Sequence, residues 1–217
     1  MPAARLNLPN AITVARILVC PLISYLALSG SVPARYWAFV LFVFAALSDL
    51  WDGYLARKHG LITDVGKLLD PIADKLLLVS TFIPFYFIAQ RPDDLDRVPW
   101  WGTFPLWVVL VVLGRELLVT LFRSYAARRG VVISAGQSGK YKAFIQNLFI
   151  GGLLLWYPLV RDGVRLGWSG SAWAGWRFFH EAWIGILLAV AVILTVYSMV
   201  DYLWSYRAVV RRGQSPQ

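Results

Sequence analysis

The sequence predicts an all-α integral membrane protein with six transmembrane helices and a polar active-site cavity on the cytoplasmic side. Three observations predict the helical membrane class. Hydrophobic residues make up 59% of the 217 residues, the mean hydropathy is +0.60, and apolar stretches of bilayer-spanning length recur along the chain. A helix needs about 20 apolar residues to cross the hydrocarbon core of a bilayer. Because no long linker interrupts the pattern, we expect one compact helical domain.

The predicted elements follow one another along the whole chain. The six spans cover residues 11–29, 36–57, 68–89, 103–127, 143–160 and 183–206. Residues 1–10 form a juxtamembrane segment, residues 11–207 the six-helix domain and residues 208–217 a cytoplasmic tail. The first span is preceded by little charge and ends in ALSGSVPARYW, a poor cleavage site, so we expect it to be retained. The Trp-rich stretch from Arg161 to His180 predicts an interfacial loop or a short surface helix.

The charge distribution predicts the topology. The chain carries 21 Lys and Arg against 12 Asp and Glu, a net charge of +9. These basic residues flank the apolar spans, which favours a membrane orientation signal over a nucleic-acid surface. With the N-terminus inside, the cytoplasmic segments hold twelve basic residues and the outer ones six. We therefore expect a multi-pass membrane protein with both termini and the active site on the cytoplasmic side.

Four aspartates near the cytoplasmic ends of the second and third predicted spans are the main candidates for a site. Asp49 and Asp52 are three residues apart, and Asp70 and Asp74 are four apart. On helices, each spacing places its two carboxylates on one face. Carboxylates near lipid are rarely present without a neutralising partner, and helix capping does not account for four of them. Their hard oxygen ligands suit Mg²⁺ or Mn²⁺ rather than Zn²⁺.

The window that contains these aspartates resembles the signature of the CDP-alcohol phosphatidyltransferases at all eight defining positions. It reads Asp49-x2-Asp52-Gly53-x2-Ala56-Arg57-x8-Gly66-x3-Asp70-x3-Asp74. The resemblance implies that the four aspartates hold two divalent ions and that Asp74 is also the general base. It further implies a site for the CDP moiety, bordered by Gly53, Ala56, Arg57 and Gly66, together with Asn10 and Thr13. The implied reaction is attack of an alcohol on a CDP-lipid, with release of CMP.

Three further segments bear on the acceptor alcohol: LNLPNAITVARI, GRELLVTLFRSYAARRG and SAGQSGKYKAFIQ. They resemble the bacterial phosphatidylglycerophosphate synthases of that family, except that Ala143 stands where the pattern often has Thr. The basic group Arg123, Lys140 and Lys142 suits an acceptor that bears a phosphate. The resemblance thus implies transfer from CDP-diacylglycerol to sn-glycerol 3-phosphate in phospholipid biosynthesis. Positive-inside anchoring is the alternative explanation of these three cations.

Several alternatives remain open at the level of sequence. Arg16, within the first span, either contacts a phosphate or carboxylate or extends to the inner membrane surface. The eight-residue signature does not separate glycerol 3-phosphate from the acceptors of phosphatidylinositol-phosphate, cardiolipin or phosphatidylserine synthases. A divalent-cation transporter is the alternative from another class, but the acidic residues gather at one end rather than along a pore. A homodimer is expected from the resemblance alone.

Overall fold

The structure is a computed structural model that describes residues 8–59, 63–129 and 137–205. This part of the chain forms six α-helices and one short 3-10 helix, and no strand. The helices are α1 (Leu8–Leu28), α2 (Val32–His59), α3 (Asp64–Ala89), η1 (Asp94–Asp96), α4 (Leu106–Arg128), α5 (Gln137–Arg165) and α6 (Ser171–Ser205). The all-α class predicted from the sequence is therefore confirmed.

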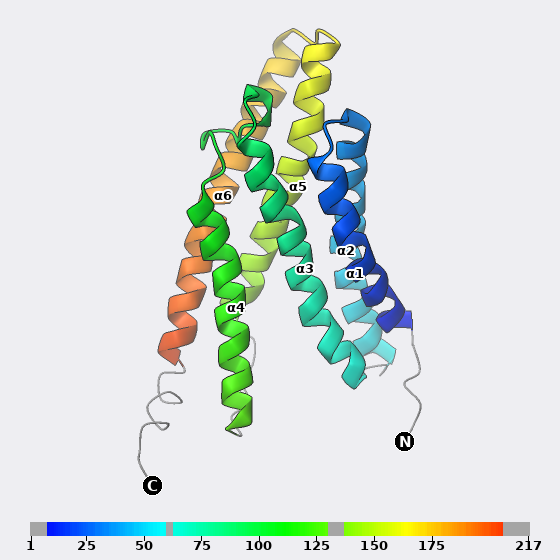
Figure 1. Cartoon of the computed structure of the whole chain (residues 1–217), viewed down its shortest axis with the longest axis vertical. Helices are drawn as coiled ribbons and strands as arrows, with labels where there is room; N and C mark the ends of the chain where they lie inside the picture. The colour runs from blue at the N-terminus through cyan, green and yellow to red at the C-terminus, as the bar shows by residue number, and fades with distance from the viewer. Residues whose placement is uncertain (1–7, 60–62, 130–136, 206–217) are drawn as a thin grey trace.

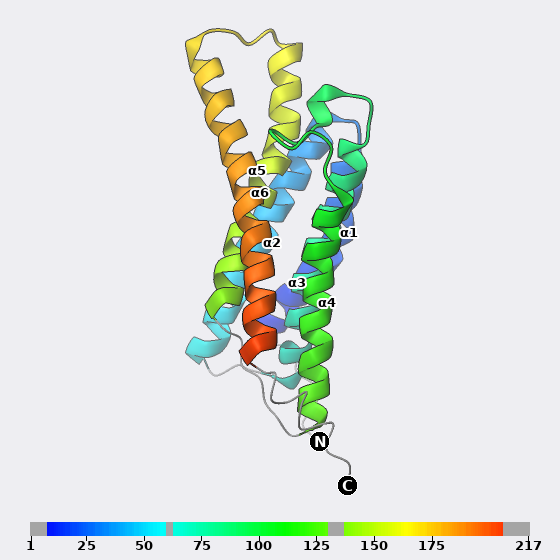
Figure 2. The ribbon, with the colours of Figure 1, turned by 90° about the vertical axis from the view of Figure 1, so that its left-hand side faces the viewer.

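The helices run lengthwise in one elongated bundle (Figures 1 and 2). Helix α1 packs against α2 and α3, α5 packs against α2 and α6, and α4 packs against α3 and α6. Helix α1 begins and α6 ends at the same end of the bundle, which we call the lower end, as Figure 1 draws it. The α1–α2 and α5–α6 connections lie at the opposite, upper end. The chain therefore makes an even number of passes along the bundle between the start of α1 and the end of α6.

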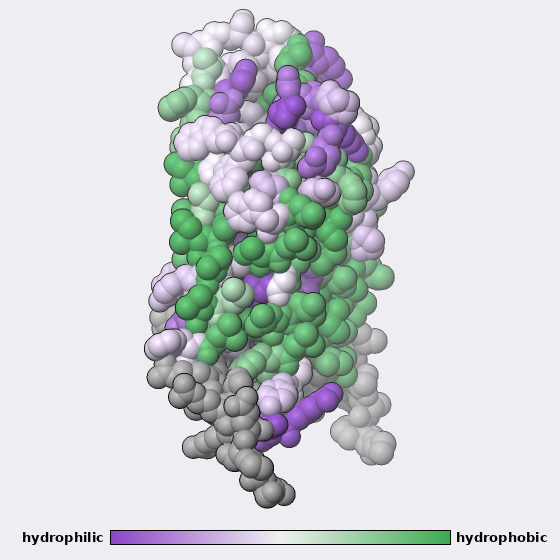
Figure 3. Space-filling model, turned by 60° about the vertical axis from the view of Figure 1, so that its left-hand side comes forward, coloured by the Kyte–Doolittle hydropathy of each residue, from purple (hydrophilic) through white to green (hydrophobic). Residues whose placement is uncertain are grey.

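Five helices are long and apolar enough to span a membrane: α1, α2, α3, α5 and α6. Helix α4 is not among them, although a sixth span was predicted over residues 103–127. Every 18-residue stretch of α4 includes the three charged residues Arg115, Glu116 and Arg123. No stretch of α4 long enough to cross a membrane is therefore as poor in charged residues as those of the other five helices. Figure 3 shows the expected surface, with a broad apolar band below polar side chains at the upper end. The chain is a multi-pass membrane protein.

The upper end of α5 and α6 differs from the predicted interfacial loop over residues 161–180. Helix α5 continues to Arg165 and α6 begins at Ser171, so only five residues join them. Two glycines with positive φ, Gly167 at 65° and Gly170 at 97°, allow this short turn. His180 consequently lies in α6, where its Nε2 is 2.9 Å from the Gly152 carbonyl oxygen of α5.

A buried aromatic cluster lies at the centre of the bundle. Its members are Phe82 and Phe85 of α3, Phe104 before α4, and Phe149 of α5, each fully buried. Their ring centroids are 5.9 to 6.3 Å apart. Tilted and edge-on ring pairs at these separations are favourable beyond the area that they bury. The cluster fixes α3 against α5 and so sets the spacing of the polar side chains below it.

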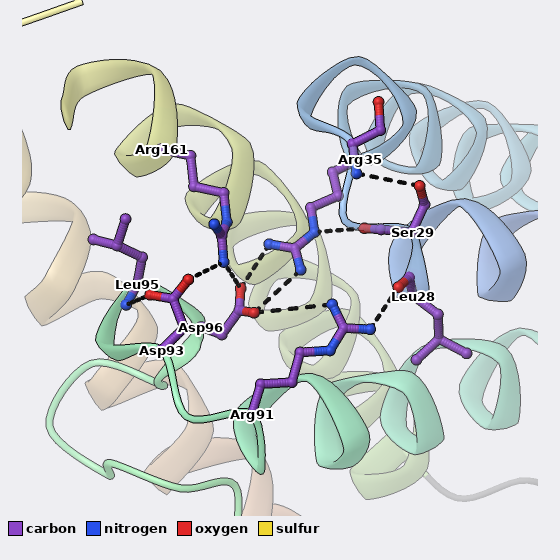
Figure 4. Close-up of polar contacts among 9 residues, drawn as sticks. Leu28, Ser29, Arg35, Arg91, Asp93, Leu95, Asp96 and Arg161 are labelled. Carbon is purple, nitrogen blue, oxygen red and sulfur yellow. Dashed lines mark hydrogen bonds and ion pairs between the residues drawn. The ribbon is translucent and has the colours of Figure 1, made fainter. Parts of the chain in front are cut away.

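A cluster of ion pairs closes the upper end of the bundle (Figure 4), and we call it the upper-end ion cluster. It consists of Arg35, Arg91, Asp93, Asp96 and Arg161. The Asp96 carboxylate, only 1% exposed, accepts from Arg35 at 2.6 and 3.3 Å and lies 2.9 Å from an Arg161 nitrogen. Arg91 is 3.9 Å from its other oxygen. One buried carboxylate thus connects α2, the end of α3 and α5.

The same cluster holds the turn between α1 and α2. Arg35 donates to the Ser29 carbonyl at 3.1 Å, and Arg91 donates to the Leu28 carbonyl. Asp93 accepts from Arg161 at 2.7 Å and from the Leu95 backbone N–H at 2.9 Å. The Leu95 N–H, followed by Arg161, holds the pKa of Asp93 below its usual range, although burial opposes this shift. Asp93 is therefore ionised at neutral pH.

Candidate active site

One cavity in the lower half of the bundle receives side chains from all six helices. Its volume is about 360 Å³. Arg16 of α1, Asp49 of α2 and Asp74 of α3 lie on one side of its lining. The remaining polar lining comes from the other three helices: Arg115, Glu116, Arg123, Lys140, Lys142, Gln146, Asn147, Ser198, Asp201 and Tyr202. The bundle therefore brings two signature aspartates together with the predicted basic residues.

Arg16 connects the two aspartates that line the cavity. Its guanidinium, 2% exposed, forms ion pairs with Asp49 and, at 3.1 Å, with Asp74. Both carboxylates bond the same nitrogen atom, although they come from different helices. Two carboxylates this close repel one another unless a cation lies between them. Of the two alternatives that the sequence left open for Arg16, the structure shows the contact with carboxylates and not extension to the membrane surface.

Asn10, Thr13 and Arg16 form one polar face of α1, because a spacing of three residues brings side chains to the same side of a helix. The Asn10 amide nitrogen donates to Thr63 Oγ1 at 2.9 Å, just before α3. The Thr13 hydroxyl lies 3.0 Å from Asp70 Oδ1. All three side chains are buried, at 2 to 5% exposure. This face therefore aligns α1 with the first turns of α3, where Asp70 and Asp74 lie.

Gly66 of α3 lies where α1 approaches most closely. A Cβ atom at this position would come within 2.7 Å of Asn10 Oδ1 and 3.2 Å of Thr63 Oγ1. Thr63 also caps α3, since its hydroxyl accepts from the Gly66 N–H at 3.0 Å. The absence of a side chain at Gly66 thus has a packing function here. It leaves room for Asn10, which the sequence assigned to the CDP site.

Two of the four predicted metal ligands lie together at the cavity. Asp49 and Asp74 share Arg16, whereas Asp70 lies one turn before Asp74 and pairs with Thr13; Asp70 and Asp74 are both exposed. Asp52 lies in α2, but the structure does not describe the surroundings of its side chain. The same holds for Gly53, Ala56 and Arg57. In the part of the chain that the structure describes, no group of three or more acidic, His or Cys side chains converges as a metal site. The full ligand set therefore stays a prediction.

The predicted acceptor residues all line the cavity, but their surroundings differ. Arg123 and Lys140 are exposed at its edge, and the Arg123 guanidinium lies 5.7 Å from the centre of the Tyr202 ring. Lys142 is 2% exposed, and its ammonium pairs with Glu116. Glu116 also accepts from Arg115 at 2.9 Å. Lys142 thus completes a buried charged triad, and Arg123 and Lys140 offer the more accessible positive charge.

Among the lining residues that the sequence did not place in the site are Arg115, Glu116 and Gln146. A signal was available for two of them. Gln146 follows Lys142 by four residues, which places both on one face of a helix. Glu116 is a carboxylate within an apolar stretch, where an ionised group requires a partner. The identity of that partner, Lys142 from another helix, was not readable from spacing.

An apolar groove leads away from the cavity between α2, α5 and α6. Its volume is about 960 Å³, and it shares Ala46, Asp49, Lys140, Ala143 and Asn147 with the cavity. Phe42, Phe144 and Leu148 line its middle, and His180 and Trp183 lie at its far end. The shared residues make the two spaces adjacent. A molecule with a charged head in the cavity could therefore extend an apolar tail along the groove.

The fold and this cavity define a multi-pass helical membrane protein with a charged site that adjoins an apolar groove. A family model described as CDP-alcohol phosphatidyltransferase matches residues 6–197. The chain belongs to the CDP-alcohol phosphatidyltransferase family, which confirms the resemblance recognised in the sequence.

Curated bacterial relatives agree with this assignment. A CDP-diacylglycerol--glycerol-3-phosphate 3-phosphatidyltransferase of Rickettsia typhi is 38% identical over 69% of this chain and 76% of its own. A protein of the same name from Bacillus subtilis is 33% identical over 82% of this chain and 95% of its own. A probable phosphatidylglycerophosphate synthase of Mycobacterium tuberculosis is 34% identical over 91% of this chain and 80% of its own.

Proposed function

We propose that this protein transfers the phosphatidyl group of CDP-diacylglycerol to sn-glycerol 3-phosphate, giving phosphatidylglycerophosphate and CMP. The observation that carries the proposal is that the charged cavity adjoins the apolar groove, with five lining residues in common. The two spaces together suit a substrate with a charged head and long acyl chains. Arg123 and Lys140 at the cavity edge suit a phosphate on the acceptor. The names of the bacterial relatives support the same pair of substrates.

We propose that Asp49, Asp52, Asp70 and Asp74 hold two Mg²⁺ or Mn²⁺ ions. The donor set fits this role, since carboxylate oxygens are the ligands these ions prefer. The convergence of Asp49 and Asp74 on one cation, Arg16, supports it further. When bound, such ions neutralise phosphate charge and stabilise the entering and leaving oxygens. Gly53, Ala56, Arg57 and Gly66, with Asn10 and Thr13, are proposed to surround the CDP moiety.

The chain's own residues then perform three tasks in the proposed reaction. Asp74 takes the proton of the acceptor hydroxyl, whose oxygen bonds to the lipid-proximal phosphorus while the bond from that phosphorus to the CMP oxygen breaks. Arg123, Lys140 and Lys142 hold the acceptor phosphate. The groove lined by Phe42, Phe144 and Leu148 holds acyl chain and excludes water from that side. We further propose a homodimer in a bacterial inner membrane, with the lower end and both termini cytoplasmic.

A panel of acceptors tests the proposed function. The purified full chain in detergent, supplied with CDP-diacylglycerol and Mg²⁺, should release CMP with sn-glycerol 3-phosphate and not with inositol phosphate, phosphatidylglycerol or serine. The basic cavity edge gives the phosphorylated acceptor its advantage. Turnover with inositol phosphate instead would reassign the acceptor within the family. Failure to release CMP with any acceptor would favour the cation-transporter alternative.

Replacing Arg16 should separate metal binding from turnover. Arg16→Met removes a buried positive charge from between Asp49 and Asp74, so their affinity for a divalent cation should rise. We expect Mn²⁺ to bind at least about tenfold more tightly, the equivalent of about 1.4 kcal/mol. Turnover should fall, because the two carboxylates lose the group that orients them. Mn²⁺ titration followed by electron paramagnetic resonance, beside CMP release, measures both quantities.

Arg16→Lys is the matched control for this experiment. The lysine keeps the positive charge but lacks the planar fork of the guanidinium. It should return the Mn²⁺ affinity close to that of the unsubstituted protein while leaving turnover impaired. If Arg16→Met bound Mn²⁺ more weakly, Arg16 would be an organiser of the metal ligands rather than a competitor of the metal.

A further inference from the structure

Gln146 carries a buried hydrogen-bond acceptor that the proposed reaction has not used. It lies on α5 one turn after Lys142, is 1% exposed and lines the cavity. Its Oε1 atom has no hydrogen-bond partner among the residues that the structure describes. Buried amide oxygens are rarely left in this state, because the lost contact with water is not replaced. The cavity is where a partner for this oxygen could come from.

The neighbouring helix fixes which end of the Gln146 amide is already hydrogen-bonded. The Gln146 Nε2 atom lies 3.1 Å from Thr195 Oγ1 of α6. The Thr195 hydroxyl donates its single hydrogen to the Ala191 carbonyl at 2.6 Å, so it can only accept from Gln146. The amide nitrogen must therefore face Thr195, which is not part of the cavity lining. The oxygen is then the amide atom left without a partner among the described residues, on a residue that lines the cavity.

We propose that Gln146 Oε1 accepts a hydrogen bond from the hydroxyl of the acceptor that does not react. This inference rests on the proposed function, in which the acceptor is a phosphorylated polyol. Arg123 and Lys140 supply cations for its phosphate, and Asp74 supplies the base for its reacting hydroxyl. The second hydroxyl of glycerol 3-phosphate then requires an acceptor. A neutral amide oxygen receives an O–H group and offers nothing to a phosphate oxygen.

This contact determines specificity rather than chemistry. An amide oxygen is too weak a base to take the proton, so Gln146 acts by selecting the acceptor. A site built around a substrate hydroxyl rejects an analogue without it, since the buried group is then left unpaired. A single neutral hydrogen bond of this kind corresponds to discrimination of about 10²-fold. Replacing the amide by an apolar side chain of similar size removes the penalty for the analogue.

Two acceptors compared on matched variants test the inference. The acceptors are sn-glycerol 3-phosphate and 3-hydroxypropyl phosphate, which keeps the phosphate and the reacting hydroxyl but lacks the middle one. The full chain should prefer the first by about 10²-fold in kcat/KM, measured as CMP release with CDP-diacylglycerol. Gln146→Leu should reduce this preference to about threefold or less, mainly by loss of activity on glycerol 3-phosphate. The control Gln90→Leu, at the upper end of α3, should keep the full preference.

A second variant guards against misfolding of the first. Thr195→Val leaves Gln146 in place but removes the hydroxyl that orients its amide, so the preference should also fall several-fold. An unchanged preference in folded Gln146→Leu would overturn the inference and leave the proposed function intact, with water as the partner of the oxygen. A raised KM for CDP-diacylglycerol with the acceptor preference kept would also overturn it. The hydrogen bond to Gln146 Oε1 would then come from the nucleotide and not from the acceptor alcohol. If the unsubstituted protein released no CMP with glycerol 3-phosphate, the proposed function would fail and the inference with it.

Discussion

Asp74→Asn should lower kcat for CMP release by about 10³-fold or more while the protein stays folded. A positioned general base contributes about 10²–10⁴-fold to a proton-transfer step, and asparagine has no basic oxygen of comparable strength. The substitution keeps the size of the side chain, and Arg16 keeps its ion pair with Asp49. The expected loss is therefore one of chemistry and not of packing. Steady-state CMP release and thermal unfolding of the same preparation measure the two effects side by side.

Metal binding divides the two roles proposed for Asp74. If Asp74→Asn binds Mn²⁺ as the unsubstituted protein does, the lost turnover belongs to the base. If Mn²⁺ binding is lost as well, the role as ligand is sufficient to explain the defect. Asp94→Asn, which removes the same charge at an exposed position of the upper end, should affect neither quantity. Near-normal turnover by Asp74→Asn would contradict the assignment of Asp74 to the reaction.

Asp96→Asn should destabilise the fold by about 3–5 kcal/mol, although Asp96 lies at the end of the bundle away from the cavity. Removing one partner of a buried ion pair leaves the other charge buried and uncompensated. Here the uncompensated charges would be those of Arg35, which is 2% exposed, and to a lesser degree Arg161. Thermal unfolding in detergent, followed by circular dichroism, should show a large fall in the midpoint, because the contacts of α2, α3 and α5 at this end weaken together.

Asp94 provides the matched control two residues away. Its side chain is 90% exposed and forms an ion pair with Arg97, three residues further along. Exposed pairs of this kind contribute little, so Asp94→Asn should leave the unfolding midpoint nearly unchanged. Equal midpoints for the two variants would mean that the upper-end ion cluster does not hold the bundle together. The same comparison separates a local charge effect from a general effect of removing negative charge.

Spacing and hydropathy were sufficient to predict much of this protein. Apolar stretches predict bilayer-spanning helices because the lipid solvent demands both apolar side chains and internally bonded backbone. The eight signature positions predict the family, and Arg123, Lys140 and Lys142 were all found at the cavity. The boundaries were less well predicted. Between α5 and α6, Trp-rich sequence was read as a loop, whereas packing of Trp173 against Gly163 extends both helices.

The partners of charged groups could not be predicted, because they come from residues distant in the sequence. Asp96 appears in the sequence as one polar residue of a turn, and only the fold places Arg35, 61 positions away, against it. The same holds for Arg16, whose two carboxylate partners lie 33 and 58 positions away. A sequence shows that a charge within an apolar stretch needs compensation, but not which helix supplies it.

The sequence by itself determined the class of this protein and its family, because hydrophobic length and fixed spacing are local properties of a chain. The tertiary structure alone decided how the cavity residues are shared between tasks. It placed Arg16 between Asp49 and Asp74, paired Lys142 with Glu116, and left the Gln146 oxygen without a partner among the described residues. Such contacts depend on how six helices meet, and side-chain charge and hydrogen bonding become specific only at that point.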